Sequence, residues 1–289
     1  GGTCMADVPG PTCMCAPGFT GISCERRMVA SRIGSWELNP FGVTAAGNAV
    51  KLARVAQILN RYDLVAIQGI TDTTGTVVPA MLAALNERAG ANVYAAVTGS
   101  RVGRTTAKQQ YAVFYRTSHH QVLTHADYAD TADAFDFDPL MVHLRNVASG
   151  TEYALIILRT EPVAVRAELD ALPAVSAAAS VQFGTTHAAI IGDFNADCAY
   201  VSDTEFQMLE LISGATAGAW QWLSDQSWDT TTVATSDCAY SHLVVSAGLA
   251  PQFIPGSAQA YDFATELALD PATATSVANQ KPVELSIGF

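Results

Sequence analysis

The sequence predicts an α+β fold in which two packed sheets are covered on the outside by helices. Strand-like and helical patterns alternate along the chain from Arg32 onward, and several neighbouring strand segments form hairpin-like pairs. The chain has 289 residues and is 49% hydrophobic, which is enough to bury a large core. We therefore expect one large domain with a small appendage.

Helices are predicted where apolar residues recur at spacings of three and four. In residues 48–62 such positions include Val55, Ile58 and Leu59. Further helices are predicted over 77–90, which a glycine closes, and over 165–183. Short apolar runs that are bounded by polar residues predict strands. These strands cover 63–70, 111–116, 140–144, 153–160, 187–194, 241–246 and 282–289.

The charge balance argues mildly against a nucleic-acid partner. The net charge is −12, and no run of Lys and Arg forms a basic patch. Such a surface repels phosphate backbones unless metal ions intervene. No apolar run reaches the roughly 18 residues that a membrane span requires.

The six cysteines fall into two groups. Four crowd the first 25 residues, and two stand far downstream at Cys198 and Cys238. A zinc site fits the first group poorly, because a Cys-x-Cys pair lies there without a nearby histidine. A disulfide scaffold from an oxidising compartment fits better, so we expect an extracellular protein.

Residues 1–25 contain "GGTC", a Cys-x-Cys pair and "PGFTGISC", and they resemble the second half of an epidermal-growth-factor-like (EGF-like) module. The resemblance implies a Cys15–Cys24 disulfide. Cys4 and Cys13 lack their usual upstream partners, so they bond each other, bond another chain or stay reduced. We expect the natural protein to continue before Gly1. Residues 26–30 are expected to link this module to a main domain over 31–289.

The main domain carries "NRYDLVAIQ", "YAVFYR", "GDFNADCAY", "DTTTVATSDCAY" and "IPGSAQAYDF" in order. With these motifs it resembles pancreatic-type deoxyribonuclease of the endonuclease/exonuclease/phosphatase superfamily. The resemblance implies a four-layer α/β/β/α sandwich of the deoxyribonuclease-like type and a disulfide between Cys198 and Cys238.

In that family two histidines act as acid and base, each oriented by a carboxylate, and a glutamate holds Mg²⁺. The resemblance places other residues at these positions and retains only two polar ones. The replaced positions are Glu37, Gly69, Gln109, Arg159, Ser241, Asn279 and Gln280, and the retained ones are Asp193 and Asn195. Loss of one general acid or base typically costs about 10²–10⁴ in rate. We therefore expect a domain that is not an enzyme and holds no catalytic Mg²⁺.

Two interpretations of the altered cleft remain open. Glu37 and Asp193 could hold a metal ion, or Glu37 could pair with Arg159, and we favour the ion pair. The six histidines are expected to lie away from the cleft. Asp193 and Asn195 are expected to bond backbone amides at the corner where a strand ends.

Structural calcium is also implied by the resemblance. One calcium loop corresponds to Asp229 and Thr231, and another to Asp133, the carbonyl of Phe135 and Asp138. Oxygen-rich loops suit Ca²⁺. The alternative is that both are solvated acidic loops.

These observations predict an extracellular structural or protein-interaction component of a larger modular protein, a filament or a surface assembly. Its partners would be proteins or further copies of itself rather than nucleic acid. The alternatives are a residual metal-dependent phosphodiesterase and a module that binds a glycan or small ligand in the cleft.

Overall fold

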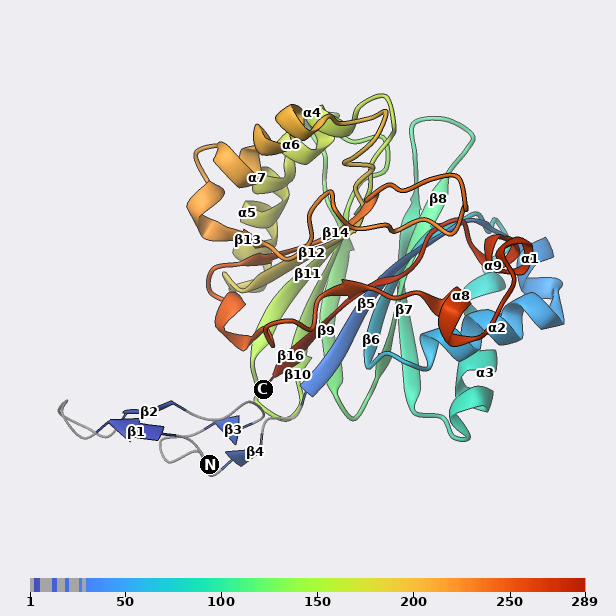
Figure 1. Cartoon of the computed structure of the whole chain (residues 1–289), viewed down its shortest axis with the longest axis horizontal. Helices are drawn as coiled ribbons and strands as arrows, with labels where there is room; N and C mark the ends of the chain where they lie inside the picture. Colours follow the sequence, from blue (N-terminus) through green and yellow to red (C-terminus); the bar gives the residue numbers. More distant parts are fainter. Residues whose placement is uncertain (1–2, 6–11, 15–18, 21–25, 28–29, 289) are drawn as a thin grey trace.

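Two six-stranded sheets pack face to face with helices on both outer sides (Figure 1). The computed structural model describes residues 3–5, 12–14, 19–20, 26–27 and 30–288. The arrangement confirms the predicted four-layer α/β/β/α sandwich.

The first sheet has one parallel pair, β11–β12, and its other neighbouring strands run antiparallel. Its strands, in spatial order, are β13 (Trp220–Trp222), β14 (Ser241–Ser246), β12 (Ala188–Asp193), β11 (Glu152–Arg159), β10 (Leu140–Asn146) and β9 (His120–Asp127).

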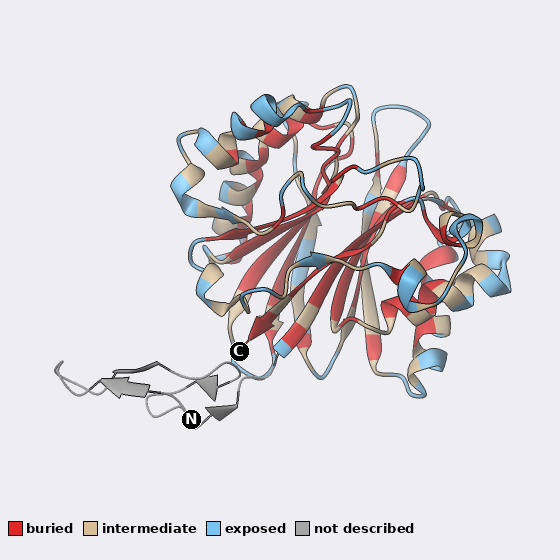
Figure 2. Ribbon diagram, viewed as in Figure 1, coloured by how far each residue is buried: buried red, intermediate tan, exposed pale blue. Residues whose placement is uncertain are grey.

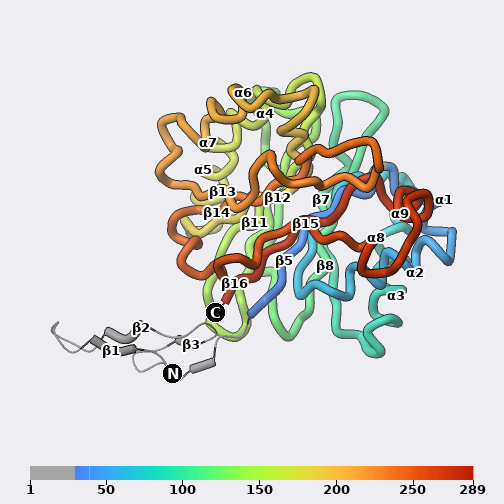
Figure 3. The backbone as a smooth tube through the Cα atoms, viewed as in Figure 1, coloured from blue at the N-terminus to red at the C-terminus, as the bar shows by residue number. Residues whose placement is uncertain are grey.

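The second sheet likewise has one parallel pair, β5–β6. Its strands, in spatial order, are β15 (Gln259–Ala260), β16 (Val283–Gly288), β5 (Ala30–Phe41), β6 (Leu64–Ile70), β8 (Gln109–Arg116) and β7 (Tyr94–Val102). Figure 3 shows β5 and β16 side by side, and Ala30 pairs with Gly288 in their register.

Helices and short turns cover both outer faces. Over the second sheet lie α1 (Val43–Gly47), α2 (Ala49–Leu59), α3 (Val77–Ala89), α8 (Phe263–Glu266) and α9 (Pro271–Val277). Over the first sheet lie α4 (Val165–Asp170), α5 (Leu172–Phe183), α6 (Asp203–Gln207) and α7 (Glu210–Ser213). The 3₁₀ turns η1 (Ala217–Ala219) and η2 (Ala250–Gln252) complete the set of described helices.

Three apolar clusters hold the layers together, and the central strands are buried along most of their length (Figure 2). The middle cluster lies between the sheets and includes Ile33, Leu155 and Ile191. The outer clusters join the sheets to the helices, as Trp36 and Ile156 do on opposite sides. Because both faces of the sheets are covered at their centres, central strands such as β6, β12 and β14 are buried on both faces, whereas the edge strands β7 and β9 are partly exposed.

The structure corrects several details of the predicted elements. Residues 165–183 form two helices, α4 and α5, because Pro173 in the first turn of α5 lacks an amide hydrogen and cannot continue the hydrogen bonds of α4. Strands β5, β7, β9, β13 and β15 were not predicted. The predicted linker 26–30 also contains β4 (Arg26–Arg27) and the first residue of β5.

The described N-terminal residues form two short hairpins. β1 (Thr3–Met5) pairs with β2 (Thr12–Met14), with Cys4 opposite Cys13, and β3 (Phe19–Thr20) pairs with β4. Cys15 and Cys24 lie outside the described residues. The side chains of Cys4 and Cys13 do too, so the disulfides of this segment stay predictions.

Candidate functional site

The candidate site lies where strands from both sheets end close together. Arg159 ends β11 and lies beside Asp193, which ends β12, and Asp193 lies beside Ser241 at the start of β14. Glu37 reaches the same place from β5 of the other sheet. The site is therefore built on rigid strands, and loops complete it.

Three charged side chains form the floor of the site. Arg159 Nε lies 3.5 Å from Glu37 Oε1 and 3.6 Å from Asp193 Oδ2. All three side chains are largely buried, at 14%, 6% and 2% exposure respectively. The expected ion pair between Glu37 and Arg159 is thus confirmed, and Asp193 shares the same cation.

Burial and pairing oppose each other in this cluster. Burial raises the pKa of Asp193, although Arg159, Gln280 and Asn195 act to lower it. Burial acts to lower the pKa of Arg159, but the charges of Glu37 and Asp193 outweigh it and raise that pKa. Arg159 therefore stays charged and serves as the counterion of two carboxylates. Its guanidinium also lies 5.2 Å from the centre of the Phe137 ring.

The floor opens into a cavity of about 340 Å³. The lining is mixed, with charged, amide, hydroxyl and aromatic side chains. It consists of Glu37, Arg159, Pro162, Asp193, Asn195, Tyr200, Thr231, Val233, Ser236, Tyr240, Asn279 and Gln280. The structure thus brings six of the nine residues predicted for the cleft together here.

The other three predicted cleft residues do not line the cavity. Ser241 lies directly behind it and donates a hydrogen bond to Gln280 Oε1 at 2.7 Å. Gly69 sits at a bulge of β6 with a φ of 79°, a backbone conformation that favours glycine. Gln109 begins β8 and is buried, and its Oε1 has no hydrogen-bond partner among the described residues.

Asn195 holds the corner after β12, but it does so by donating to a backbone carbonyl rather than by bonding the backbone amides that were expected. It adopts a left-handed backbone with a φ of 49°. Its side-chain nitrogen donates to Thr160 O at 3.1 Å and lies 3.4 Å from Asp193 Oδ2. The bond to Thr160 joins the ends of β11 and β12, so Asn195 positions both Arg159 and Asp193.

The histidines lie away from the cavity, as predicted. His242 points to the opposite side of β14 from Ser241 and is buried against Phe194 and Trp222. Its Nδ1 lies 2.9 Å from Ser224 Oγ, and burial lowers its pKa to about 4. None of the six histidines, all within the described part of the chain, lines the cavity.

The two loops predicted to bind calcium differ in their contacts. Asp229 bonds Thr231 and also accepts a hydrogen bond from Lys281 Nζ at 2.6 Å, so an ammonium group occupies one carboxylate oxygen. In the other loop Asp133 pairs with Arg104 at the surface. Burial raises the pKa of Asp138, and the neighbouring Asp130, Asp127 and Asp133 raise it further. The second loop therefore gathers several carboxylates around one arginine, and calcium there stays a prediction.

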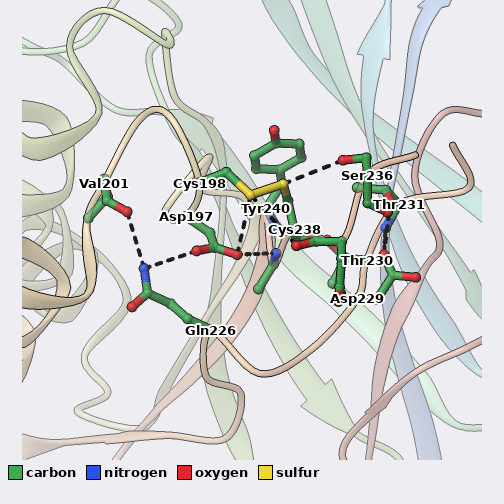
Figure 4. The surroundings of a disulfide bond; sticks show 12 residues. Asp197, Cys198, Val201, Gln226, Asp229, Thr230, Thr231, Ser236, Cys238 and Tyr240 are labelled. Atoms are coloured by element: carbon green, nitrogen blue, oxygen red, sulfur yellow. Dashed lines mark hydrogen bonds between the residues drawn. A yellow bond between two sulfur atoms is a disulfide. The ribbon is translucent and has the colours of Figure 1, made fainter. Parts of the chain in front are cut away.

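The predicted disulfide between Cys198 and Cys238 is present and joins two loops at the cavity (Figure 4). Asp197 lies beside it and accepts a hydrogen bond from Ala239 N at 2.7 Å. Asp197, Cys198 and Cys238 are close enough to resemble metal ligands, but both sulfurs are consumed by the disulfide.

Sequence reasoning missed the aromatic part of this cavity. Tyr200 and Tyr240 each follow a disulfide cysteine by two residues, in "CAYV" and "CAYS". Their ring centres lie 5.6 Å apart. The repeated Cys-Ala-Tyr pattern, taken together with the implied disulfide, was the signal that could have placed both rings side by side.

The comparison with protein families gives two matches. The family described as "Endonuclease/Exonuclease/phosphatase family" matches residues 34–256, and "EGF-like domain" matches residues 1–23. Across the described residues, every helix is too short or too polar to cross a bilayer.

Several curated relatives cover nearly the whole chain. "Deoxyribonuclease-1" of Oryctolagus cuniculus is 31% identical over 263 residues, which cover 89% of this chain and 92% of the relative. "Deoxyribonuclease-1-like 2" of Mus musculus is 33% identical over 259 residues, with 89% and 91% covered.

Solved structures show the same fold. An endonuclease/exonuclease/phosphatase family protein from Bacteroides thetaiotaomicron superposes with a TM-score of 0.61 at 15% identity. The match covers 91% of this chain and 99% of that protein.

These relatives correct one prediction. The substitutions at the cleft led us to expect a domain that is not an enzyme, yet relatives that match it over nearly its full length are named as deoxyribonucleases. The comparisons contain no sign that catalysis has been lost. Their names also weigh against the expectation that nucleic acid is excluded as a partner.

Proposed function

Because the chain belongs to the endonuclease/exonuclease/phosphatase family, we propose that it uses the family's cleft outside the cell to bind a partner within a larger assembly. The observation that carries this proposal is the cavity floored by Glu37, Arg159 and Asp193.

The site is preorganised for binding. Its charged floor is internally paired, and strands and the Asn195 bridge fix its geometry. Groups that are already held in place lose little freedom when a ligand binds, so more of the interaction energy appears as affinity. A volume of about 340 Å³ lies within the range of ligand sites in proteins.

Three apolar side chains at the cavity or next to a lining residue are exposed. Tyr200 and Val233 line the cavity and are 41% and 37% exposed. Val163, next to the lining residue Pro162, is 92% exposed. Grouped exposed apolar side chains around a polar pocket commonly mark an interaction site.

An extracellular setting is supported by the disulfide and by the EGF-like match. Disulfides persist in oxidising compartments and are rare in the cytosol. EGF-like modules are among the small disulfide-dense domains of secreted proteins. Both observations favour a modular secreted or cell-surface protein.

Site-specific photo-crosslinking tests this proposal. A benzophenone amino acid at position 200 should give a discrete adduct with extracellular material from the cells that make the protein. The same probe at Val181, which is 88% exposed in α5 and lies outside the cavity, is the control. No adduct at 200, or the same adducts at both positions, would contradict the proposal.

Phosphodiester cleavage is a second candidate, because the named deoxyribonucleases are relatives and Asp193 and Asn195 occupy the positions expected of that family. Glu37 and Asp193 do not fit a metal ion in their present arrangement, since both contact Arg159. This candidate therefore requires either a shift of Arg159 or a mechanism that differs at this position.

A plasmid-nicking assay with Mg²⁺, Mn²⁺ and Ca²⁺ decides this candidate. Cleavage by the purified protein that disappears in Asp193→Ala would establish it. Glu205→Ala is the matched control, since Glu205 is an exposed carboxylate that caps α6 outside the cavity. If none of the three proteins nicks the plasmid, phosphodiester cleavage is excluded as a function.

A further inference from the structure

Tyr200 and Tyr240 form one aromatic wall at the mouth of the cavity. Their rings are 5.6 Å apart and tilted by 44°, and both line the cavity. The Cys198–Cys238 disulfide joins the two loops two residues before each ring, so it holds the rings together. Figure 4 shows Tyr240 next to the disulfide.

Asn195 lies within hydrogen-bonding distance of one oxygen of the Asp193 carboxylate, whereas the other oxygen has no hydrogen bond within the described chain. Asp193 is 2% exposed, and its Oδ1 atom has no hydrogen-bond partner among the described residues. A buried carboxylate oxygen without a partner is costly. Because Asp193 lines the cavity, a ligand can supply the missing donor.

The charges of the floor narrow the chemistry of that ligand. Glu37, Asp193 and Arg159 sum to −1, so an anionic group is repelled. A second cation would meet Arg159, which already contacts both carboxylates. A neutral ligand with hydroxyl groups avoids both penalties, and each hydroxyl can donate and accept hydrogen bonds.

The walls match such a ligand. Asn279 and Ser236 add amide and hydroxyl groups. Tyrosine rings offer an apolar face for stacking together with a polar tip. One face of a sugar ring is apolar C–H surface and its edge carries hydroxyls, which is the combination that these walls complement.

We propose that the partner bound in this cleft is a carbohydrate, with one pyranose ring stacked on Tyr200 and Tyr240 and one hydroxyl donating to Asp193 Oδ1. This inference rests on the proposed binding function and names the chemical class of its ligand. The sugar can belong to a glycan on a neighbouring component of the assembly.

Saturation-transfer NMR with free methyl pyranosides tests the inference on the full chain. The probes are methyl α-mannoside, methyl β-glucoside, methyl β-galactoside and methyl N-acetyl-β-glucosaminide. We expect saturable binding of at least one probe, weakened about tenfold in Tyr200→Ala, which corresponds to the loss of one stacking contact. Tyr200→Phe keeps the ring and should bind nearly as the unchanged protein does.

Two further measurements check that the Tyr200 variant is folded and that Asp193 contributes to sugar binding. Tyr200 is 41% exposed, so its replacement should leave the unfolding temperature nearly unchanged. Asp193→Asn, which turns the carboxylate into an amide of the same shape, should weaken the binding as well. The absence of saturable binding by all four probes, or equal binding by Tyr200→Ala, would overturn the inference.

The two proposals fail separately. A photo-crosslinked partner at position 200 combined with no pyranoside binding would leave the binding function standing and remove the carbohydrate. Failure of both experiments would remove both.

Discussion

Glu37 of one sheet and Asp193 of the other contact the same nitrogen of Arg159, at 3.5 and 3.6 Å. The guanidinium therefore bridges the two sheets at the cleft. Removal of the cation would leave two buried carboxylates without a counterion.

Arg159→Met should lower the free energy of unfolding by about 3–5 kcal/mol, because breaking a buried ion pair leaves an uncompensated charge. Urea unfolding measures this loss. Adding Glu37→Gln to Arg159→Met should recover part of it.

The control is Arg104→Met. Arg104 pairs with Asp133 at the surface, where both side chains are well exposed, so this change should leave stability nearly as it was. Equal losses for the two arginines would contradict the role assigned to Arg159.

Gly69→Ala should destabilise the protein by about 1–2 kcal/mol, because its φ of 79° places the new Cβ in the left-handed region. Gly47→Ala is the matched control, since Gly47 lies in α1 outside that region and an added Cβ meets nothing within 4 Å. Thermal and urea unfolding of both variants measure the difference. If Gly69→Ala costs no more than the control, backbone strain is not the reason for a glycine at this position.

Glu168 should make the stability depend on pH. Burial raises its pKa to about 7 from 4.5, although hydrogen bonds from Asp136 N and Glu161 N act to lower it. The folded state therefore binds more protons than the unfolded state between these values, so stability falls as pH rises from 4.5 to 7.

Glu168→Gln removes this group and should flatten that part of the pH profile. The difference between the two proteins in free energy of unfolding should change by about 2–3 kcal/mol from pH 4.5 to 7. Urea unfolding across this range measures it. Parallel profiles for the two proteins would show that Glu168 titrates normally.

Removing the disulfide should destabilise the fold and separate the tyrosine pair. Replacing Cys198 and Cys238 with alanine opens a loop with a sequence separation of 40, and the chain-entropy model gives a loss of about 4 kcal/mol. Urea unfolding measures that loss. Quenching and emission of the tyrosines should change as well, and an unchanged free energy of unfolding would contradict the stabilising role.

Calcium should stabilise the domain through the acidic loop of Asp133 and Asp138. We expect the unfolding temperature to rise on addition of about 1 mM CaCl₂, the level that extracellular calcium sites use. Asp138→Asn should reduce this shift. Asp229→Asn should leave it unchanged, because Lys281 already neutralises Asp229. If calcium does not raise the unfolding temperature, the acidic loop does not bind this ion.

Strands marked by a continuous apolar run and helices ended by a glycine could be predicted well from the sequence. The apolar run "SHLVVS" coincides with β14, and Gly90 ends α3 as expected. Strand β5 was missed because Ser31, Gly34 and Ser35 give it a loop-like composition. These residues are buried only because β16 and β6 flank the strand on both sides, which is a tertiary effect.

Some residues of the candidate site could likewise be predicted from the sequence, and others could not. The pairing of Glu37 with Arg159 could be predicted, since the family resemblance placed both residues in the cleft. Tyr200 and Tyr240 were missed, although each follows a cysteine in the same Cys-Ala-Tyr pattern, because the pattern gains meaning only when the Cys198–Cys238 disulfide joins the two loops. The expectation of a non-enzyme failed for another reason, because it compared individual positions with one mechanism and the relatives as whole proteins are named deoxyribonucleases.

The central claim is that the rim of this cleft holds the protein in an extracellular assembly. Retention of a tagged chain in the extracellular fraction of its native source tests it most directly, with Tyr200→Arg compared with Val181→Arg. Both positions are exposed, and only the first lines the cavity. We expect the Tyr200→Arg protein to be released and the Val181→Arg protein to be retained, and equal retention of the two would contradict a role of the rim in the assembly.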